Sequence, residues 1–198
     1  MTGNYRFYRG CYRLARALFG IFYRIEVSGR ANIPESAAVI CGNHSSVFDP
    51  VFVAFAFGID CFLHFVAKVE LFKTPLLSSV VKGLGAISVN REISDIATIK
   101  NILACLKSGE KVGIFPEGTR SSTGGSLSLK CGAVKIAERA KVPLVPVYIP
   151  RHKPLFSKIH IIIGEMHYIG KPDARRSFDD YYGLTEELMR EIESLGGR

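Results

Sequence analysis

The sequence predicts an α/β fold: a mostly parallel central sheet flanked by helices, with an N-terminal amphipathic helical membrane-binding segment. After Pro34, short apolar runs alternate with helical stretches, as expected when strands alternate with helices. The runs are continuously apolar, which is typical of parallel strands covered on both faces. Residues 1–30 lack this alternation and contain six arginines and one acid, Glu26. We therefore expect residues 1–30 to form a membrane-association segment and residues 31–198 to form the globular domain.

The composition favours a folded domain with anionic partners. With 198 residues, of which 47% are hydrophobic and 22% charged, the chain has enough apolar material for a full core. This excludes a disordered chain, a collagen-like chain and a small disulfide-stapled scaffold. Lysine and arginine total 26 against 18 aspartates and glutamates, and the net charge of +8 favours phosphate, nucleic acid or an anionic lipid surface as the partner. The mean hydropathy of +0.18 favours contact with a membrane.

Residues 4–25 predict the first helix, which Gly10 and Gly20 could divide into two. At about 100° per residue, arginines gather on one side, apolar side chains on another, and tyrosines along a border. This pattern is typical of a helix that lies in a lipid interface. The alternative is a helix that caps the protein's own core, with its arginines in solvent. The arginines are Arg6, Arg9, Arg13, Arg16 and Arg24; the apolar side is Phe7, Cys11, Leu14, Leu18, Ile21, Phe22 and Ile25; the tyrosines are Tyr5, Tyr8, Tyr12 and Tyr23.

The elements of the domain follow in turn. Six apolar runs predict strands, at Ala38–Cys41, Phe62–Ala67, Ala86–Val89, Val112–Phe115, Leu144–Ile149 and Ile159–Ile163. Helices are expected at Pro50–Phe57, Glu70–Lys82, Ser94–Lys107, Lys130–Ala140 and Gly183–Leu195. The third helix has the clearest signals, because Ser94 suits its N-cap, Asp95 favours its first turn and Gly109 stops it.

One apolar stretch, Val51–Ala67, is a candidate for a membrane span. It is shorter than the ~20 residues that a span requires, and Asp60 and His64 interrupt it. We therefore expect a buried helix followed by a buried strand. Arg16 and Arg24 interrupt the apolar stretch at the N-terminus, so we expect no secretory signal.

A histidine and an aspartate follow the first predicted strand of the domain, where ligands gather in α/β folds. His44 leaves the end of the strand, and Asp49 lies five positions later, beside Pro50, which suits a helix start. This spacing can fold back so that the carboxylate holds Nδ1–H of the imidazole and leaves Nε2 as a general base. The alternative is a loop histidine that a helix-capping aspartate satisfies.

Cationic residues follow two other strand ends. Arg91 follows one, and Arg120 and then Lys130 follow another. Guanidinium groups bind phosphate with two parallel hydrogen bonds, and cations at neighbouring strand ends favour a phosphate site over isolated surface ion pairs. Glu117 lies among them, either as a structural partner for an arginine or as an acceptor for a substrate hydroxyl.

Four blocks of sequence resemble, in order, those of the glycerolipid acyltransferases. The segment from Asn43-His44 to Asp49 resembles the N-H-x-x-x-x-D block, which contains the HX4D motif. GAISVNR, FPEGTR and VPLVPV resemble the second, third and fourth blocks, at Gly85–Arg91, Phe115–Arg120 and Val142–Val147. One block would be weak evidence, but four in order are specific. The chain thus resembles the 1-acylglycerol-3-phosphate O-acyltransferase (PlsC-like) family over about residues 30–150.

The resemblance implies a role for each matching residue. His44 would take the proton from the acceptor hydroxyl, and Asp49 would orient its imidazole. The acceptor would be held by residues of the second and third blocks and the lysine that follows them. Arg91, Arg120 and Lys130 would bind its phosphate, and Glu117, Gly118 and Thr119 would line the rest of its site. Cys131, where many relatives carry a basic residue or a proline, is a departure from the family pattern.

The resemblance also implies the reaction and its place. The enzyme would acylate the sn-2 hydroxyl of lysophosphatidate, giving phosphatidate in phospholipid biosynthesis. Its co-substrate would be an acyl thioester, either acyl-CoA or acyl-ACP (acyl carrier protein), and it would need no cofactor. It would bind the anionic membrane surface as a peripheral or monotopic protein on the cytoplasmic face of the cell membrane. The oxyanion donors stay open between Asn43 and loop N–H groups.

Three alternatives remain open at this stage. A related acyltransferase would use another lysophospholipid or glycerol 3-phosphate as acceptor. An inactive relative would act as a lipid-binding scaffold, although it would not need both His44 and Asp49. A basic nucleic-acid-binding protein would explain the charge, but the excess is concentrated at the N-terminus and no nucleic-acid-binding motif is present, so we expect no nucleic-acid partner.

The remaining histidines and the five cysteines show no ligand spacing, so we expect no metal site. The cysteines are read as buried free thiols, and the histidines as core or surface residues. The histidines are His64, His152, His160 and His167; the cysteines are Cys11, Cys41, Cys61, Cys105 and Cys131.

Overall fold

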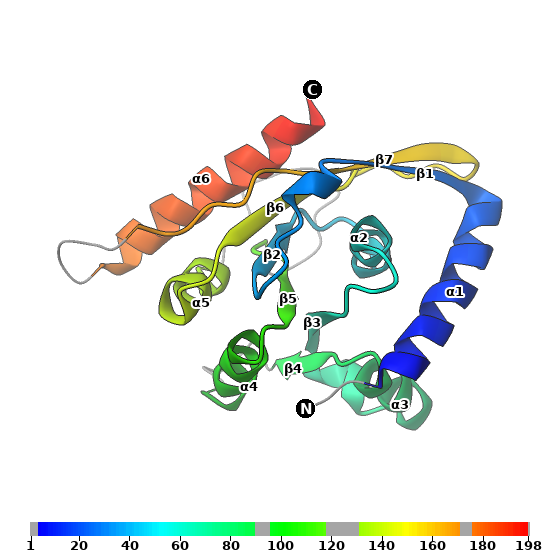
Figure 1. Ribbon diagram of the computed structural model, residues 1–198, viewed down its shortest axis with the longest axis horizontal. Helices are drawn as coiled ribbons and strands as arrows, with labels where there is room; N and C mark the ends of the chain where they lie inside the picture. The colour runs from blue at the N-terminus through cyan, green and yellow to red at the C-terminus, as the bar shows by residue number, and fades with distance from the viewer. Residues whose placement is uncertain (1–3, 90–95, 118–130, 171–175, 198) are drawn as a thin grey trace.

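Seven strands form one sheet in the residues that the computed structural model describes, which are 4–89, 96–117, 131–170 and 176–197 (Figure 1). The strands are β1 (Tyr23–Ser28), β2 (Val39–Gly42), β3 (Leu63–Lys68), β4 (Ile87–Val89), β5 (Lys111–Ile114), β6 (Leu144–Tyr148) and β7 (Ser157–Ile163). They lie in the order β1-β7-β6-β2-β5-β3-β4. Among these strands every pairing is parallel except that of β6 with β7. The predicted α/β class with a mostly parallel sheet is therefore confirmed.

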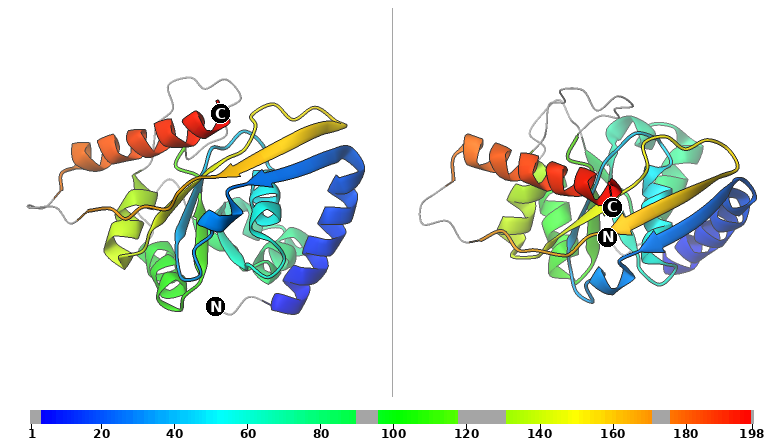
Figure 2. Two further views of the ribbon diagram at one scale, coloured as in Figure 1. Left: turned by 45° about the horizontal axis from the view of Figure 1, so that its top comes forward. Right: turned by 90° about the horizontal axis from the view of Figure 1, so that it is seen from above.

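Helices cover both faces of the sheet (Figures 1 and 2). The helices are α1 (Tyr5–Phe22), α2 (Asp49–Phe57), α3 (Pro75–Gly83), α4 (Ile96–Lys107), α5 (Gly132–Ala140) and α6 (Phe178–Gly196), with 3-10 turns η1 (Arg30–Asn32) and η2 (Val69–Phe72). Helices α4, α5 and α6 pack with Val39 and Cys41 of β2 in one core. Helices α1 and α2 pack in a second core with Ile40 and with Ala38, the residue before β2. Successive residues of one run thus face opposite cores, which explains why it is continuously apolar.

The register of the central strands creates the edge at which the functional residues lie. Strand β2 pairs with β5 on one side, where Cys41 faces Ile114, and with β6 on the other, where Gly42 faces Val147. Because all three strands run in the same direction, the chain leaves each of them at the same edge. The loops after β2, β5 and β6 therefore meet there, as expected for a ligand site in an α/β sheet.

The N-terminal segment differs from the helix expected over residues 4–25. Helix α1 continues through both glycines but ends at Phe22, and Tyr23–Ser28 forms edge strand β1, parallel to β7. Ile25 and Val27 are β-branched residues at alternate positions and pack on the second core, and pairing with the distant strand β7 makes this segment a strand. The first 30 residues thus contribute both a helix and a strand. The functional division at residue 30 stays a prediction.

Two helix boundaries also differ from expectation. The helix expected over Glu70–Lys82 is two elements, η2 and α3, because Pro75 disfavours helical geometry at Thr74. The last helix begins at Phe178, earlier than expected, because Ser177 and Asp180 form a capping box ahead of it. The predicted N-cap Ser94 lies outside the described residues. None of the helices in the described part of the chain combines the length and the apolar character that crossing a bilayer requires.

Gly113 of β5 makes room for Phe65, its register partner on β3. A Cβ atom at position 113 would lie 2.4 Å from Cε1 of the Phe65 ring. We expect Gly113→Ala to lower the free energy of unfolding by about 1–3 kcal/mol, because the ring must shift within a close-packed core. Urea denaturation measures this change.

The matched control is Gly132→Ala at the start of α5, where an added Cβ would meet no atom of the described residues within 4 Å. We expect the free energy of unfolding of this variant to change by less than about 1 kcal/mol. Equal losses in both variants would contradict the packing role of Gly113.

Candidate active site

The loop between β2 and α2 brings His44 and Asp49 together. Nδ1 of His44 lies 3.0 Å from Oδ2 of Asp49, and the two residues are 8% and 0% exposed. The same oxygen accepts hydrogen bonds from the backbone N–H groups of Ser45 and Ser46, each at 2.7 Å. A carboxylate only accepts, so Nδ1 carries the proton and Nε2 of the neutral ring keeps its lone pair. The catalytic roles of the pair stay a prediction.

Lys153 lies on the other side of the Asp49 carboxylate. Its Nζ is 2.9 Å from Oδ1 of Asp49 and 2.8 Å from Oγ of Ser45, and its side chain is only 7% exposed. Burial works to raise the pKa of Asp49, but hydrogen bonds from His44, Ser46 and Lys153 outweigh it and hold that pKa below its ordinary value. Asp49 is therefore ionised at neutral pH, as an acceptor for the imidazole Nδ1–H must be.

Two phenylalanines fix the plane of the His44 ring. The ring stacks on Phe115, with centroids 4.3 Å apart and planes inclined by 17°. Phe65 stacks in turn on Phe115, at 6.1 Å and 10°. The imidazole is thus held at its edge by Asp49 and on its face by Phe115. This arrangement limits the directions in which Nε2 can point.

Glu117, at the carboxyl end of β5, is 1% exposed and joins three loops. Its Oε1 accepts hydrogen bonds from the backbone N–H of His44 at 3.3 Å and from Nη2 of Arg151 at 2.8 Å. Arg151 also pairs with Glu193 of α6 at 2.5 Å. Burial works to lower the pKa of Arg151, but the two carboxylates outweigh it and raise that pKa. Oε2 of Glu117 is buried and accepts no hydrogen bond from any residue that the structure describes.

Asn43 has a structural position. Its Nδ2 donates to the carbonyl of Ile149 at 2.7 Å, and its Oδ1 accepts from the N–H of the same residue at 2.8 Å. Asn43 is fully buried, so its amide joins the ends of β2 and β6. The expectation that Asn43 is a candidate oxyanion donor is therefore not supported by its contacts.

A cavity of about 440 Å³ opens beside His44. Apolar side chains from several elements form most of its wall, and Lys68 and Glu70 line one part of it. The apolar lining residues are Val47, Pro50, Phe65, Val66, Ala67, Leu71, Leu77 and Phe115. A largely apolar cavity with one imidazole in its wall suits a substrate that is apolar along most of its length and reacts at one polar atom.

Several predicted binding residues cannot be placed. The structure does not describe residues 90–95 or 118–130, so five of the predicted residues lie outside the described part of the chain: Arg91, Gly118, Thr119, Arg120 and Lys130. Of the predicted acceptor-binding residues, Glu117 is the one that the described residues include.

Lys153 and Arg151 were missed as part of the site. The basic run Arg151-His152-Lys153 reads as a solvated loop or a headgroup contact, but two of its side chains turn inward to Asp49 and Glu117. The position of the run is informative, because it follows strand β6. Like His44 and Glu117, these cations follow the carboxyl end of a strand, where ligand sites of α/β folds lie.

The chain is similar to known acyltransferases. The acyltransferase family model matches residues 24–150, which include all four sequence blocks. A 1-acyl-sn-glycerol-3-phosphate acyltransferase of Bacillus subtilis is 33% identical over 95% of this chain and 96% of its own length. A protein of the same name from Borreliella burgdorferi is 33% identical over 76% of this chain and 60% of its own.

A solved structure has a similar fold. The crystal structure of the 1-acyl-sn-glycerophosphate (LPA) acyltransferase PlsC from Thermotoga maritima superposes with a TM-score of 0.71 at 27% identity. The match covers 98% of this chain and 80% of that one.

Replacing Lys153 should destabilise the protein. We expect Lys153→Met to lower the free energy of unfolding by about 3–5 kcal/mol, because it leaves the buried Asp49 carboxylate without its cation. Lys158→Met is the matched control, since Lys158 pairs with Glu26 at 2.6 Å but its side chain is 56% exposed. Its cost should stay below about 1 kcal/mol. Urea denaturation at pH 7 compares the two.

The same variant should be more sensitive to acid. A carboxylate with a lowered pKa stabilises the fold above its unfolded-state pKa, and this contribution is lost as pH falls through the folded-state pKa. Without Lys153 the pKa of Asp49 rises, so the loss should begin at a higher pH than in the unmodified protein. An identical acid limb in the two stability curves would contradict the coupling between Lys153 and Asp49.

Proposed function

Because this chain belongs to the acyltransferase family, we propose that it transfers an acyl group from an acyl thioester to the sn-2 hydroxyl of lysophosphatidate, giving phosphatidate for phospholipid biosynthesis. Family membership makes the chain an O-acyltransferase. The names of the relatives support the acceptor, and one structural observation carries the proposal. That observation is the His44–Asp49 pair beside a largely apolar cavity.

The proposed chemistry uses the free nitrogen of His44. Nε2 accepts the hydroxyl proton while the hydroxyl oxygen attacks the thioester carbonyl, and Asp49 stabilises the imidazolium that forms. The new ester C–O bond replaces the C–S bond as the tetrahedral intermediate collapses. The thiolate leaves with the electron pair of the C–S bond and takes the proton from the imidazolium. A thioester is already reactive, so alignment and deprotonation of the alcohol supply much of the rate enhancement.

The acceptor site is proposed from the carboxyl ends of the strands. Oε2 of Glu117 accepts no hydrogen bond from the described residues and would accept one from a glycerol hydroxyl, whereas Oε1 already accepts from His44 and Arg151. We assign the phosphate to two arginines of the matching blocks and the lysine that follows them, and the rest of the acceptor contacts to the neighbouring loop. The phosphate ligands are Arg91, Arg120 and Lys130, and the loop residues are Gly118 and Thr119.

Helix α1 supports contact with a membrane surface. Three aromatic residues of the helix pack inward: Tyr8 is 5% exposed, and Tyr12 and Phe19 contact the second core, whereas Tyr5 in the first turn is 51% exposed. Its aliphatic side stays in solvent, with Leu14 63% and Ile21 65% exposed. We propose that this side enters the lipid interface and that the arginines contact anionic headgroups on the cytoplasmic face of the membrane.

The exposed apolar surface continues toward the site. Phe22 of α1 contacts Phe156, which is 76% exposed, at a centroid distance of 5.8 Å. Phe19 contacts Phe48 of the His44 loop at 5.3 Å, and Phe48 is 50% exposed. Exposed apolar side chains therefore lie both beside the end of α1 and on the loop that carries His44. A lipid acceptor that stays in its leaflet would meet the imidazole at this position.

Replacement of His44 tests the catalytic role. We expect His44→Ala to reduce acyl transfer to lysophosphatidate by at least about 100-fold, the contribution of general-base catalysis. Thiol release from acyl-CoA and from acyl-ACP measures the rate. The control is His160→Ala, because His160 contacts Ser28 on β7 and β1 and not the site. Near-normal transfer by His44→Ala would exclude His44 as the base.

The same assay tests the acceptor. Acyl transfer by the unmodified protein is measured with each of three acceptors: lysophosphatidate, glycerol 3-phosphate and a lysophospholipid that carries a headgroup. Transfer to lysophosphatidate is the expected result. Turnover of headgroup-bearing lysolipids or glycerol 3-phosphate without turnover of lysophosphatidate would replace the proposed acceptor with one of the alternatives.

Polar substitutions on the aliphatic side of α1 test the membrane contact. We expect Leu14→Gln combined with Ile21→Gln to weaken binding to phosphatidylglycerol vesicles by at least about tenfold, from the loss of two inserted side chains. Ile96→Gln combined with Tyr168→Gln is the matched control, since these residues are 66% and 63% exposed and are not part of α1. Vesicle sedimentation measures binding. Equal binding by the two double variants would contradict the proposed surface.

A further inference from the structure

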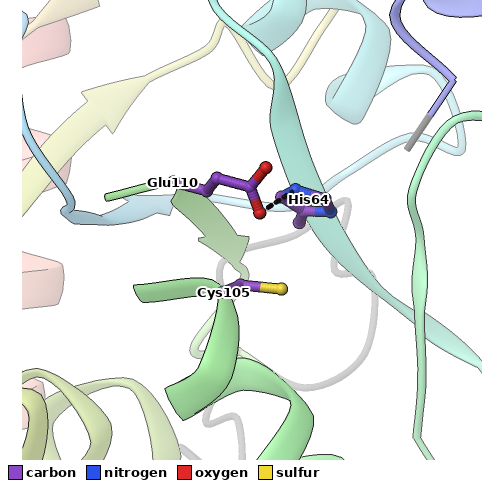
Figure 3. A group of neighbouring side chains, drawn as sticks. All are labelled: His64, Cys105 and Glu110. Atoms are coloured by element: carbon purple, nitrogen blue, oxygen red, sulfur yellow. Dashed lines mark ion pairs between the residues drawn. The ribbon is translucent and has the colours of Figure 1, made fainter. Parts of the chain in front are cut away.

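Three side chains from separate elements converge at a second cluster, on the α4 side of the sheet (Figure 3). His64 lies on β3 and is 1% exposed, Cys105 lies on α4 and is 6% exposed, and Glu110 immediately precedes β5. One nitrogen, one sulfur and one carboxylate oxygen of these residues lie within 4.8 Å of one another. Nε2 of His64 is 2.9 Å from Oε2 of Glu110.

The tautomer of His64 is determined by its other nitrogen. Nδ1 lies 2.7 Å from the carbonyl oxygen of Gly85, which can only accept, so Nδ1 carries a proton. In the neutral ring, Nε2 then directs a lone pair at the Glu110 carboxylate. Apart from this contact with Glu110, Nε2 has no polar partner among the residues that the structure describes. Two electron-rich atoms 2.9 Å apart require a cation between them, either a proton on Nε2 or a metal ion.

The surroundings favour a metal ion over a proton. A proton would satisfy His64 and Glu110 alone and would not require Cys105, which projects into the same space (Figure 3). An imidazole whose Nδ1–H is held by a backbone carbonyl is the usual arrangement of a metal-ligating histidine. Imidazole nitrogen, thiolate sulfur and carboxylate oxygen are all donors that Zn²⁺ accepts.

A fourth ligand position is available beside the cluster. A cavity of about 490 Å³ is lined by His64 and Cys105 together with Asn101 and Lys82, and it can hold a water ligand. The thiolate and the carboxylate together match the charge of a divalent ion. Burial and the Glu110 carboxylate raise the pKa of the Cys105 thiol, so metal binding there displaces a proton.

We propose that His64, Cys105 and Glu110 bind a Zn²⁺ ion that joins β3, α4 and the start of β5. In a tetrahedral site, two ligand atoms about 2.1 Å from the metal lie about 3.4 Å apart, so His64 and Glu110 would separate slightly and Cys105 would approach. The cluster does not include His44, so the ion would lie apart from the catalytic pair.

The site would brace the candidate active site from the opposite face of β3. Consecutive residues of a strand point to opposite faces, and Phe65, which follows His64, belongs to the aromatic stack under His44. The proposal does not depend on the reaction that the chain catalyses. Metal content and acyl transfer can therefore be tested separately.

Zinc titration of the 198-residue protein tests the proposal. The protein is stripped with EDTA, returned to metal-free buffer and titrated with Zn²⁺ against a chromogenic chelator. We expect one Zn²⁺ per chain and a rise in Tm when it binds. With Co²⁺, the bound form should show the near-ultraviolet charge-transfer absorption of a cobalt–thiolate bond.

Three variants identify the ligands. Cys105→Ser should abolish the cobalt–thiolate absorption and stoichiometric zinc binding. Glu110→Gln should weaken zinc binding, and because the Glu110 side chain is only partly buried, this substitution should disturb the fold little. Cys131→Ser is the control for zinc binding, because Cys131 is 5% exposed, close to the 6% of Cys105, and lies outside the cluster. Far-ultraviolet circular dichroism without metal establishes that each variant is folded. Failure of the unmodified protein to bind Zn²⁺, or equal binding by Cys105→Ser, would overturn the proposal.

Discussion

The site is organised around one buried anion, the Asp49 carboxylate. It is fully buried at the start of α2, and its contacts fix the loop that carries His44. One oxygen holds the loop backbone and the imidazole, and the other faces Lys153. A buried carboxylate is tolerated only when its charge is matched and its lone pairs are used, so these partners are mutually dependent. The same contacts that stabilise the anion therefore fix the proton on Nδ1 and leave Nε2 available as a base.

The parallel sheet explains why these partners come from distant parts of the sequence. His44 follows β2, Glu117 follows β5, and Arg151 and Lys153 follow β6, and these strands are neighbours in the sheet. Their parallel direction places all three loops at one edge. The ion pair between Arg151 and Glu117 then joins the second and third loops, and Lys153 joins the third to the first. The geometry of the site thus follows from strand order as much as from any single motif.

The strand runs and the His44–Asp49 spacing could be predicted because both are local in sequence. Continuous apolar runs report burial on both faces, and a separation of five residues allows a loop to close on itself. Strand β1 could not be separated from the preceding helix, since Tyr23–Ser28 becomes a strand only by pairing with β7, which is 134 positions farther along the chain (Tyr23 with Ser157). The inward turn of Lys153 and the meeting of His64 with Cys105 are likewise long-range contacts. Spacing rules carry no information about such contacts, whereas the order of strands in the sheet does.

Helix α1 shows how the same chain can be packed and still leave a surface for lipid. A helix with an aliphatic side and an aromatic border could bury either, and the two differ by roughly a third of a turn. The aromatic border is the one that packs inward, because Tyr8 fills a space beside Phe62 and donates its hydroxyl to the carbonyl of Cys61 at 3.0 Å. Leu14 and Ile21 therefore remain exposed to water. Exposure of apolar side chains to water costs free energy, and nothing offsets this cost while the helix stays in water. Insertion into a lipid interface would remove that cost, so the orientation of α1 connects the packing of the second core to the site at which a lipid substrate is proposed to arrive.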